Sequence, residues 1–214
     1  MTTMSNEPGV IAIIRMRATK PERELFDALV TGGVRSLEVT LPTPGSVDAI
    51  GAWAGTVPDV RVGAGTVRTA EDVTRALDAG AEFLVTPTFS IPVLDAAASG
   101  GVPVYCGATT PTECDAAWRH PAVVGVKVFP AAALGGPSYI KALGEPLDDI
   151  RLVPTGGVDI EAARTYSFMG CAGIGVGGQL VNEEIVSEGR FDELTRRSAA
   201  FVKAWVDGRE GRRK

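Results

Sequence analysis

The stretch TGGVRSLEVT (residues 31–40) contains the pattern that decides the fold, because the chain repeats it. In this stretch glycine ends a helical segment and a short apolar run follows. Glycine is the residue that most often ends a helix, and a short run rich in β-branched residues predicts a buried strand. The pattern returns in DAGAEFLVTP (78–87), SGGVPVYCG (99–107) and MGCAGIGVGG (169–178). The sequence therefore predicts a repeated connection from helix to buried strand.

Followed along the whole chain, this pattern predicts eight strands separated by segments with helical periodicity. The predicted strands are Val10–Arg15, Ser36–Leu41, Val60–Gly65, Phe83–Thr86, Val104–Gly107, Val123–Phe129, Arg151–Thr155 and Ala172–Val176. Such alternation favours parallel pairing through right-handed crossovers. Eight units in 214 residues predict an α/β protein with one domain, a (β/α)8 (TIM) barrel over residues 1–214. A doubly wound open sheet is the alternative, and we expect residues 1–8 and 207–214 to be frayed.

The composition limits the classes of function. Hydrophobic residues make up 45% of the chain and charged residues 22%, which suits a folded domain. A formal net charge of −5 and a pI near 5.0 argue against a nucleic-acid partner and against binding to an anionic membrane. The longest apolar run, Val10 to Ile14, is far shorter than the roughly 18 residues of a membrane-spanning helix. It is also too short for a secretory signal, so we expect a cytoplasmic protein.

Histidine and cysteine are too few for the common metal sites. The single histidine, His120, is expected in a solvated loop, and the three cysteines have no metal-ligand spacing. Zinc bound by imidazole or thiolate is therefore not expected, and no cluster of acidic residues indicates magnesium. We expect no metal and no cofactor.

Two charged residues interrupt apolar strands and are the first candidates for chemistry. Lys127 lies in VVGVKVFP (123–130) and Glu38 in SLEVTLP (36–42). Because side chains alternate along a strand, Lys127 is expected to face the barrel interior while its valine neighbours face the helices. A buried ammonium needs a partner of opposite charge. Removal from water also favours the neutral amine, which is the form that attacks carbonyls. We expect Glu38 to pair with Lys127 across the barrel, to move protons in catalysis, or both; a purely structural ion pair is the alternative.

Other strand ends supply candidate binding groups, since barrel enzymes place their sites at the carboxyl ends of the strands. Arg15 closes VIAIIR (10–15), where its guanidinium either clamps a carboxylate or is solvated. The hydroxyls of Thr66 and Thr155 either bind substrate or cap a helix. Glycine-rich loops after the seventh and eighth strands either form a phosphate site from backbone N–H groups or simply turn tightly. Their glycines are Gly156, Gly157, Gly177 and Gly178.

Several of these segments also match a known family. The segments are LEVTLPT (37–43), VGAGTV (62–67), VTPTFS (85–90), GVKVFPA (125–131), VPTGGV (153–158) and GIGVGG (173–178). In this order and near this spacing, from about Val10 to Val181, the chain resembles the 2-keto-3-deoxy-6-phosphogluconate (KDPG) aldolase family. That family includes the 6-phosphogalactonate and 2-keto-4-hydroxyglutarate (KHG) aldolases. The resemblance implies a class I, metal-independent pyruvate aldolase of the Entner–Doudoroff pathway on a (β/α)8 barrel, acting on a keto-acid phosphate and usually homotrimeric.

The resemblance also implies roles for individual residues. Lys127 matches the family's Schiff-base lysine, and Glu38 matches its general acid/base. Thr66 matches the threonine that helps hold the pyruvate carboxylate, while Pro87 and Phe129 match residues that line the pocket. Gly156 and Gly157 match the phosphate loop after the seventh strand.

Two positions depart from the family pattern. Many members have a carboxylate-binding arginine where this chain has Pro42, whereas Arg15 fits members that place an arginine at the end of the first strand. The family often has a serine in the phosphate loop after the eighth strand, where this chain has Gly178. The loss of that hydroxyl leaves backbone N–H groups as the expected anion ligands there.

The favoured function is class I cleavage of KDPG, or a close relative, to pyruvate and glyceraldehyde 3-phosphate. The galactonate epimer and KHG are alternative substrates: Thr155 resembles the gluconate-type members, whereas GGPSYIKAL (135–143) resembles the galactonate type. Two other classes of function stay open. One is a phosphosugar epimerase or isomerase with Glu38 as its base, and the other is a barrel that binds phosphorylated ligands without turnover.

Overall fold

The computed structural model describes residues 7–212, in which eight strands alternate with nine helices. The strands are β1 (Gly9–Ile14), β2 (Ser36–Thr40), β3 (Arg61–Gly65), β4 (Leu84–Val85), β5 (Val104–Ala108), β6 (Val123–Val128), β7 (Leu152–Pro154) and β8 (Gly173–Val176). The helices are α1 (Arg23–Thr31), α2 (Ser46–Trp53), α3 (Ala70–Asp78), α4 (Ile91–Ser99), α5 (Pro111–Trp118), α6 (Pro137–Gly144), α7 (Ile160–Met169), α8 (Glu183–Ser187) and α9 (Phe191–Arg212). All eight predicted strands are confirmed, and no strand end differs from its prediction by more than one residue.

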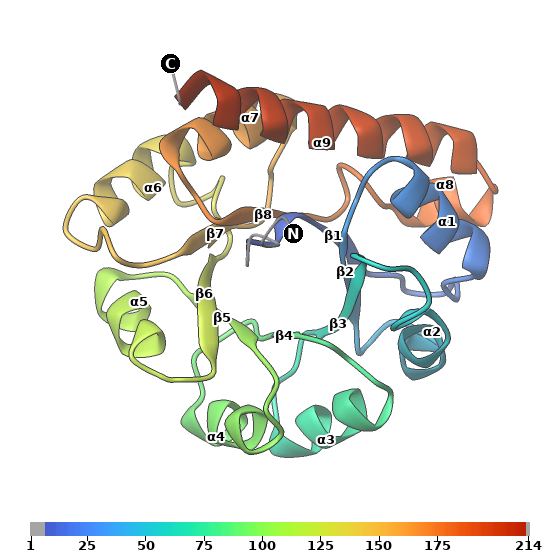
Figure 1. Cartoon of the computed structure of the whole chain (residues 1–214), viewed down its shortest axis with the longest axis horizontal. Helices are drawn as coiled ribbons and strands as arrows, with labels where there is room; N and C mark the ends of the chain where they lie inside the picture. Colours follow the sequence, from blue (N-terminus) through green and yellow to red (C-terminus); the bar gives the residue numbers. More distant parts are fainter. Residues whose placement is uncertain (1–6, 213–214) are drawn as a thin grey trace.

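The strands form one parallel sheet in the order β7-β6-β5-β4-β3-β2-β1-β8. A bridge between Thr155 and Gly175 joins β7 to β8 and closes the ring, and the helices surround it (Figure 1). Strands that are consecutive in sequence are neighbours all the way round, whereas a doubly wound sheet reverses its strand order at a switch point. The (β/α)8 barrel is therefore confirmed and the open sheet is excluded.

Alternation along the strands divides the buried side chains into two groups. Leu37 and Val39 of β2 pack outward into the main hydrophobic core beneath the helices, while Glu38 between them points inward. A smaller inner cluster of Ile11, Phe83, Val85, Tyr105, Val153 and Ala172 fills the barrel interior. Ile11 lies two residues before Ile13, the β1 residue that pairs with Glu38. The charged groups therefore lie towards the carboxyl ends of the strands.

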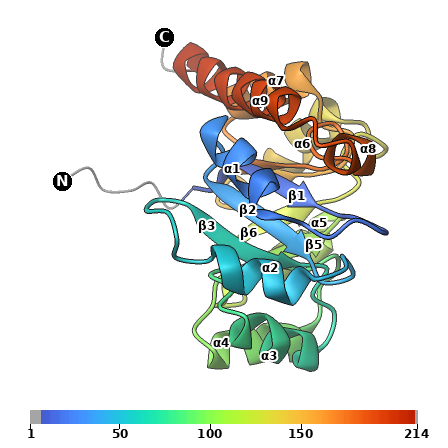
Figure 2. The same ribbon diagram turned by 90° about the vertical axis from the view of Figure 1, so that its right-hand side faces the viewer.

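Helix α9 crosses the outside of the barrel over α7 and α1 (Figures 1 and 2). It continues to Arg212, so the expectation of frayed ends is wrong for residues 207–212. Gly208 explains this continuation, because a Cβ there would come within 2.3 Å of the Arg164 carbonyl oxygen of α7. The Arg209 guanidinium donates hydrogen bonds to the Glu7 carboxylate and the Cys171 carbonyl, which also fixes residue 7. The rest of the predicted frayed ends, residues 1–6 and 213–214, lies outside the described residues.

His120 occupies the turn between α5 and β6, but its side chain is only 11% exposed. Its Nε2 lies 3.2 Å from the Asp95 carboxylate, and its Nδ1 accepts a hydrogen bond from the Ala122 N–H. The expectation of a solvated histidine is therefore wrong, because these two contacts hold the ring against the protein.

No helix within residues 7–212 is long and apolar enough to cross a membrane.

Candidate active site

Lys127 and Glu38 meet inside the barrel. Lys127 Nζ lies 4.0 Å from Glu38 Oε1, and their side chains are only 8% and 1% exposed. They come from β6 and β2, which lie on opposite sides of the ring. Glu38 Oε1 has no hydrogen-bond partner among residues 7–212. The predicted pair is confirmed, and its geometry leaves a carboxylate oxygen beside the amine as an available proton acceptor.

The space and the electrostatics around Glu38 are set by its neighbours. A Cβ on Gly65 of β3 would come 2.0 Å from Glu38 Oε1, so glycine at this position makes room for the carboxylate. Burial raises the pKa of the Glu38 carboxyl above its ordinary value, while the positive charges of Lys127 and Arg15 oppose that shift. Glu38 is therefore a more basic carboxylate than a solvated one, which suits proton transfer.

Arg15 and Thr66 form a second polar pair at the strand ends. The Arg15 Nη2 donates a hydrogen bond of 2.9 Å to Thr66 Oγ1. Thr66 has a φ of +59°, in the left-handed region that favours glycine. Below them, Thr43 Oγ1 accepts from the Met16 N–H and donates to the Ile14 carbonyl, the two residues flanking Arg15. The end of β1 is thus held so that the guanidinium faces the site.

These groups border a cavity of about 1050 Å³ at the carboxyl ends of the strands. Every predicted site residue except Glu38 lines it: Arg15, Thr66, Pro87, Lys127, Phe129, Thr155, Gly156, Gly157, Gly177 and Gly178. Glu38 lies beneath Lys127 and is fully covered. The residues predicted from the sequence therefore converge on a single cavity.

The two glycine-rich loops differ in what surrounds them. Gly157 has a φ of +70°, and a Cβ there would come within 2.5 Å of the Ala132 side chain, so the backbone requires glycine. A Cβ on Gly178 would meet nothing within 4 Å. The N–H groups of Gly157 and Gly178 donate no hydrogen bond within the described part of the chain. Both residues line the cavity, so their N–H groups are candidate donors for an anion.

Several residues of the site were missed by sequence reasoning. Thr43 supports the end of β1, and Arg17, Arg68 and Glu183 line the cavity. Arg17, Arg68 and Glu183 lie in or just after loops of charged and polar residues, and no local pattern marks them. Their position becomes evident only when the loops after β1, β3 and β8 are brought together.

Among residues 7–212, no group of three or more His, Cys, Asp or Glu side chains is placed to hold a metal ion.

Comparison with known proteins identifies this arrangement. Residues 2–197 match the family model described as KDPG and KHG aldolase. The chain is 35% identical over 197 residues to the KHG/KDPG aldolase of Escherichia coli K12, covering 91% of each protein. It superposes on a "native KDPGal" structure with a TM-score of 0.84 and 32% identity, over 98% of this chain and 100% of that one. A KDPG aldolase from Legionella pneumophila with pyruvate captured as a covalent carbinolamine gives a TM-score of 0.80 at 30% identity, over 91% and 94% of the two chains.

The protein is therefore a class I aldolase, a carbon–carbon lyase of the Schiff-base type. The chain belongs to the KDPG and KHG aldolase family.

Proposed function

We propose that the protein cleaves KDPG to pyruvate and glyceraldehyde 3-phosphate, with Lys127 as the Schiff-base lysine and Glu38 as the general acid/base. The observation that supports this most is the 4.0 Å contact between Lys127 Nζ and Glu38 Oε1 at the base of an arginine-lined cavity. An amine that attacks a ketone must be neutral, and the adjacent carboxylate is placed to take its proton.

The first stage forms the covalent bond. The neutral Lys127 amine attacks the C2 ketone of the substrate and gives a carbinolamine. Glu38 passes the proton taken from the ammonium to the departing hydroxyl, and the loss of water forms an iminium, which draws electrons from the C3–C4 bond. No metal or cofactor is required, because the iminium is itself the electron sink.

The second stage breaks the carbon–carbon bond. Glu38, directly or through one water, accepts the proton of the C4 hydroxyl, the C3–C4 electron pair moves into the iminium, and the aldehyde leaves. The remaining enamine is protonated at C3 by Glu38, which returns the proton it took. Hydrolysis of the resulting iminium releases pyruvate and the free lysine.

The rest of the cavity orients the substrate. Arg15 and Thr66, already joined by a hydrogen bond, are placed to hold the carboxylate next to the ketone. The free N–H groups of Gly157 and Gly178, with Gly156 and Gly177 beside them, suit the distal phosphate. Pro87 and Phe129 form walls, and the Phe129 ring centroid lies 5.7 Å from Lys127 Nζ.

Thr155 supports the gluconate series over the galactonate series. Its side chain is buried at the cavity edge, and a Cβ on Gly175 would come 2.4 Å from its Oγ1. Gly175 therefore makes room for the Thr155 hydroxyl, which donates to the Val153 carbonyl at 3.2 Å and is left to accept a hydrogen bond from a substrate hydroxyl near C4. The segment 135–143, which resembles the galactonate type, keeps the C4 epimer and KHG as the alternative substrates.

The test compares the three substrates on one preparation, with pyruvate release as the readout. We expect the highest kcat/KM for KDPG, and no turnover of any substrate by Lys127→Ala. A Lys141→Ala variant, which removes an exposed lysine of α6, serves as the matched control and should retain full activity. Near-normal turnover by Lys127→Ala contradicts the mechanism, and preference for the galactonate epimer or KHG reassigns the substrate.

A further inference from the structure

One carboxylate fastens the loop after β1 to the start of α8. The Glu183 carboxylate accepts hydrogen bonds from the N–H groups of Arg17, Ala18 and Thr19, at 2.7, 3.1 and 2.6 Å. A hydrogen bond from the Thr19 side chain, together with these backbone bonds, lowers the pKa of Glu183 to about 2, so the carboxylate stays charged. Three consecutive backbone donors on one side chain fix the path of the loop.

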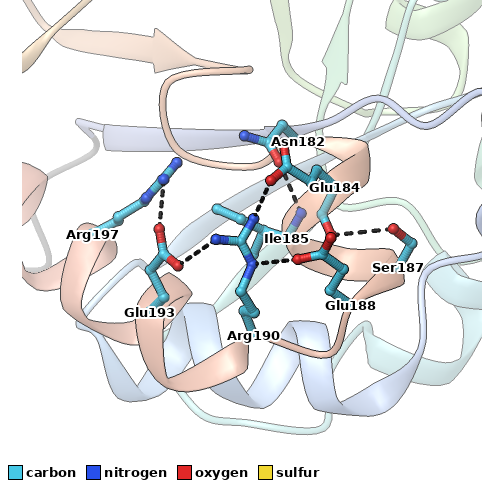
Figure 3. A network of polar contacts seen from close by, with 8 residues as sticks. All are labelled: Asn182, Glu184, Ile185, Ser187, Glu188, Arg190, Glu193 and Arg197. Carbon is cyan, nitrogen blue, oxygen red and sulfur yellow. Dashed lines mark hydrogen bonds and ion pairs between the residues drawn. The ribbon is translucent and has the colours of Figure 1, made fainter.

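Helix α8 is itself braced, so Glu183 is mounted on a fixed support. Asn182 caps the helix by accepting from the Ile185 N–H at 2.9 Å. Arg190 lies at the centre of an ion-pair network that joins α8 to α9 (Figure 3). Its guanidinium contacts the carboxylates of Glu184, Glu188 and Glu193 at 2.7, 2.9 and 2.9 Å.

The fastened loop places Arg17 at the edge of the active-site cavity. Arg17 lines the cavity together with Gly178, and their loops follow the neighbouring strands β1 and β8. The Arg17 guanidinium has no ion-pair partner within residues 7–212. Glu183, the one carboxylate among the lining residues, is already engaged with backbone donors. Among residues 7–212, no carboxylate therefore competes with an anion for the Arg17 guanidinium, which lies next to the glycine-rich loop after β8.

We propose that Arg17 binds the distal phosphate of the substrate, and that Glu183 is a positioning residue that holds Arg17 at the cavity. This inference rests on the proposed function. A planar guanidinium binds two phosphate oxygens at once. The open space at Gly178, where an added Cβ would meet nothing within 4 Å, lets the phosphate lie between the loop and the guanidinium.

The position of Arg17 distinguishes it from the other cavity arginines. Arg15 is bonded to Thr66 and lies at the carboxylate end of the site. Arg68 follows β3, which is separated from β8 by β2 and β1. Arg15 is assigned to the substrate carboxylate. Of the two other cavity arginines, Arg17 lies closer to Gly178 in the order of strands around the barrel.

The test is a pair of substrates that differ only in the phosphate: KDPG and 2-keto-3-deoxygluconate. Arg17→Ala should raise KM for KDPG by roughly ten- to a hundredfold, as loss of a charged hydrogen bond implies. It should leave kcat for KDPG, and kcat/KM for the unphosphorylated substrate, nearly unchanged. Arg119→Ala removes the same charge from an exposed pair with Asp115 on α5 and is the control for net charge. Arg68→Ala is the control for the general positive field of the cavity.

The role of Glu183 is tested by combining variants. Glu183→Ala should raise KM for KDPG, and Glu183→Gln, which keeps one acceptor oxygen, should restore part of the affinity. If Glu183 acts through Arg17, the double variant Arg17→Ala/Glu183→Ala should have nearly the same KM for KDPG as Arg17→Ala alone. Fully additive effects would show that Glu183 only stabilises the fold.

The outcomes separate this inference from the proposed function. Equal losses on both substrates, no loss in Arg17→Ala, or an equal loss in Arg68→Ala would overturn the role of Arg17 while the aldolase activity of the parent stands. Absence of KDPG cleavage by the parent protein would instead overturn the proposed function and the inference with it.

Discussion

The Glu38 carboxyl is placed where its ionisation controls the reaction. It is buried, its Oε1 lies beside Lys127 Nζ, and burial is the largest influence on its pKa. Because a general base acts only when ionised, the raised pKa must appear in the pH dependence of the rate.

We predict that kcat/KM for KDPG falls on the acid side with an apparent pKa above 4.5, the ordinary value of the carboxyl. Below the raised pKa, Glu38 holds its proton and cannot accept another, so activity is lost as pH decreases. A pH–rate profile measures this. Glu38→Gln should lose roughly 10²- to 10⁴-fold in rate. Glu113→Gln, which alters a helix-capping carboxylate on α5, should leave the profile in place. An acid limb at or below the ordinary value would contradict the role of Glu38.

Gly65 provides a second prediction about the same carboxylate. Because a Cβ there would come 2.0 Å from Glu38 Oε1, Gly65→Ala must displace the carboxylate. We expect a loss of about 1–3 kcal/mol in unfolding free energy and a fall in kcat. Gly51→Ala, in α2 with its nearest contact at 3.5 Å, is the matched control and should stabilise by about 0.5–1 kcal/mol. Urea unfolding and steady-state kinetics measure both changes, and unaltered kcat in Gly65→Ala would contradict the account.

Single residues were predictable where a local pattern reveals them. Lys127 and Glu38 stand out because a charge within an apolar strand violates the alternation of a buried sheet. Glu183 does not stand out, since its partners Arg17, Ala18 and Thr19 are 164 to 166 residues away in sequence. No local rule relates positions that only the closed ring brings together.

At the scale of elements, the junction of α8 and α9 depends on Arg190. Its guanidinium joins acidic residues of both helices, and its side chain is 37% exposed (Figure 3). Each exposed pair contributes little alone, but removal of the arginine also leaves several carboxylates close together.

We predict that Arg190→Ala lowers the unfolding free energy by about 1–2 kcal/mol, with a smaller effect at high salt because ions screen the freed carboxylates. Urea unfolding at low and high ionic strength measures this. Arg119→Ala, which removes one exposed pair with Asp115, is the control and should cost less than about 1 kcal/mol. A loss in Arg190→Ala no greater than in the control would show that the network has no cooperative role.

The elements themselves follow from the sequence more closely than their ends do. Strands buried on both faces read as short apolar runs, which is why all eight were located. The end of α9 was mispredicted because residues 207–214 are charged and contain two glycines. Gly208 is instead the point of close approach to α7, and a local reading of composition cannot detect such a contact.

At the scale of the whole molecule, an acidic protein presents a positive cavity. The net charge is −5, yet Arg15, Arg17, Arg68 and Lys127 line a cavity with Glu183 as its lining carboxylate. Such a local field attracts a substrate with a carboxylate and a phosphate, and it strengthens when water is excluded. The barrel order around β8 and β1 is what gathers these charges.

We propose a homotrimer. Ile91 and Ile160 are 47% and 39% exposed, and they lie at the starts of α4 and α7, on the face that carries the site. Exposed apolar side chains on one face favour association. Sedimentation equilibrium should give three times the chain mass of 22.3 kDa. A monomer at micromolar concentration would contradict this prediction and leave the chemistry unaffected.

The most direct test of the account is to trap the covalent intermediate. The folded protein is incubated with pyruvate and borohydride, digested, and its peptides are analysed by mass spectrometry. The account predicts a pyruvate-derived adduct on Lys127, absent without borohydride and absent in Lys127→Ala. A folded protein that acquires no adduct, or acquires it on another lysine, would contradict the assignment of Lys127 as the Schiff-base residue.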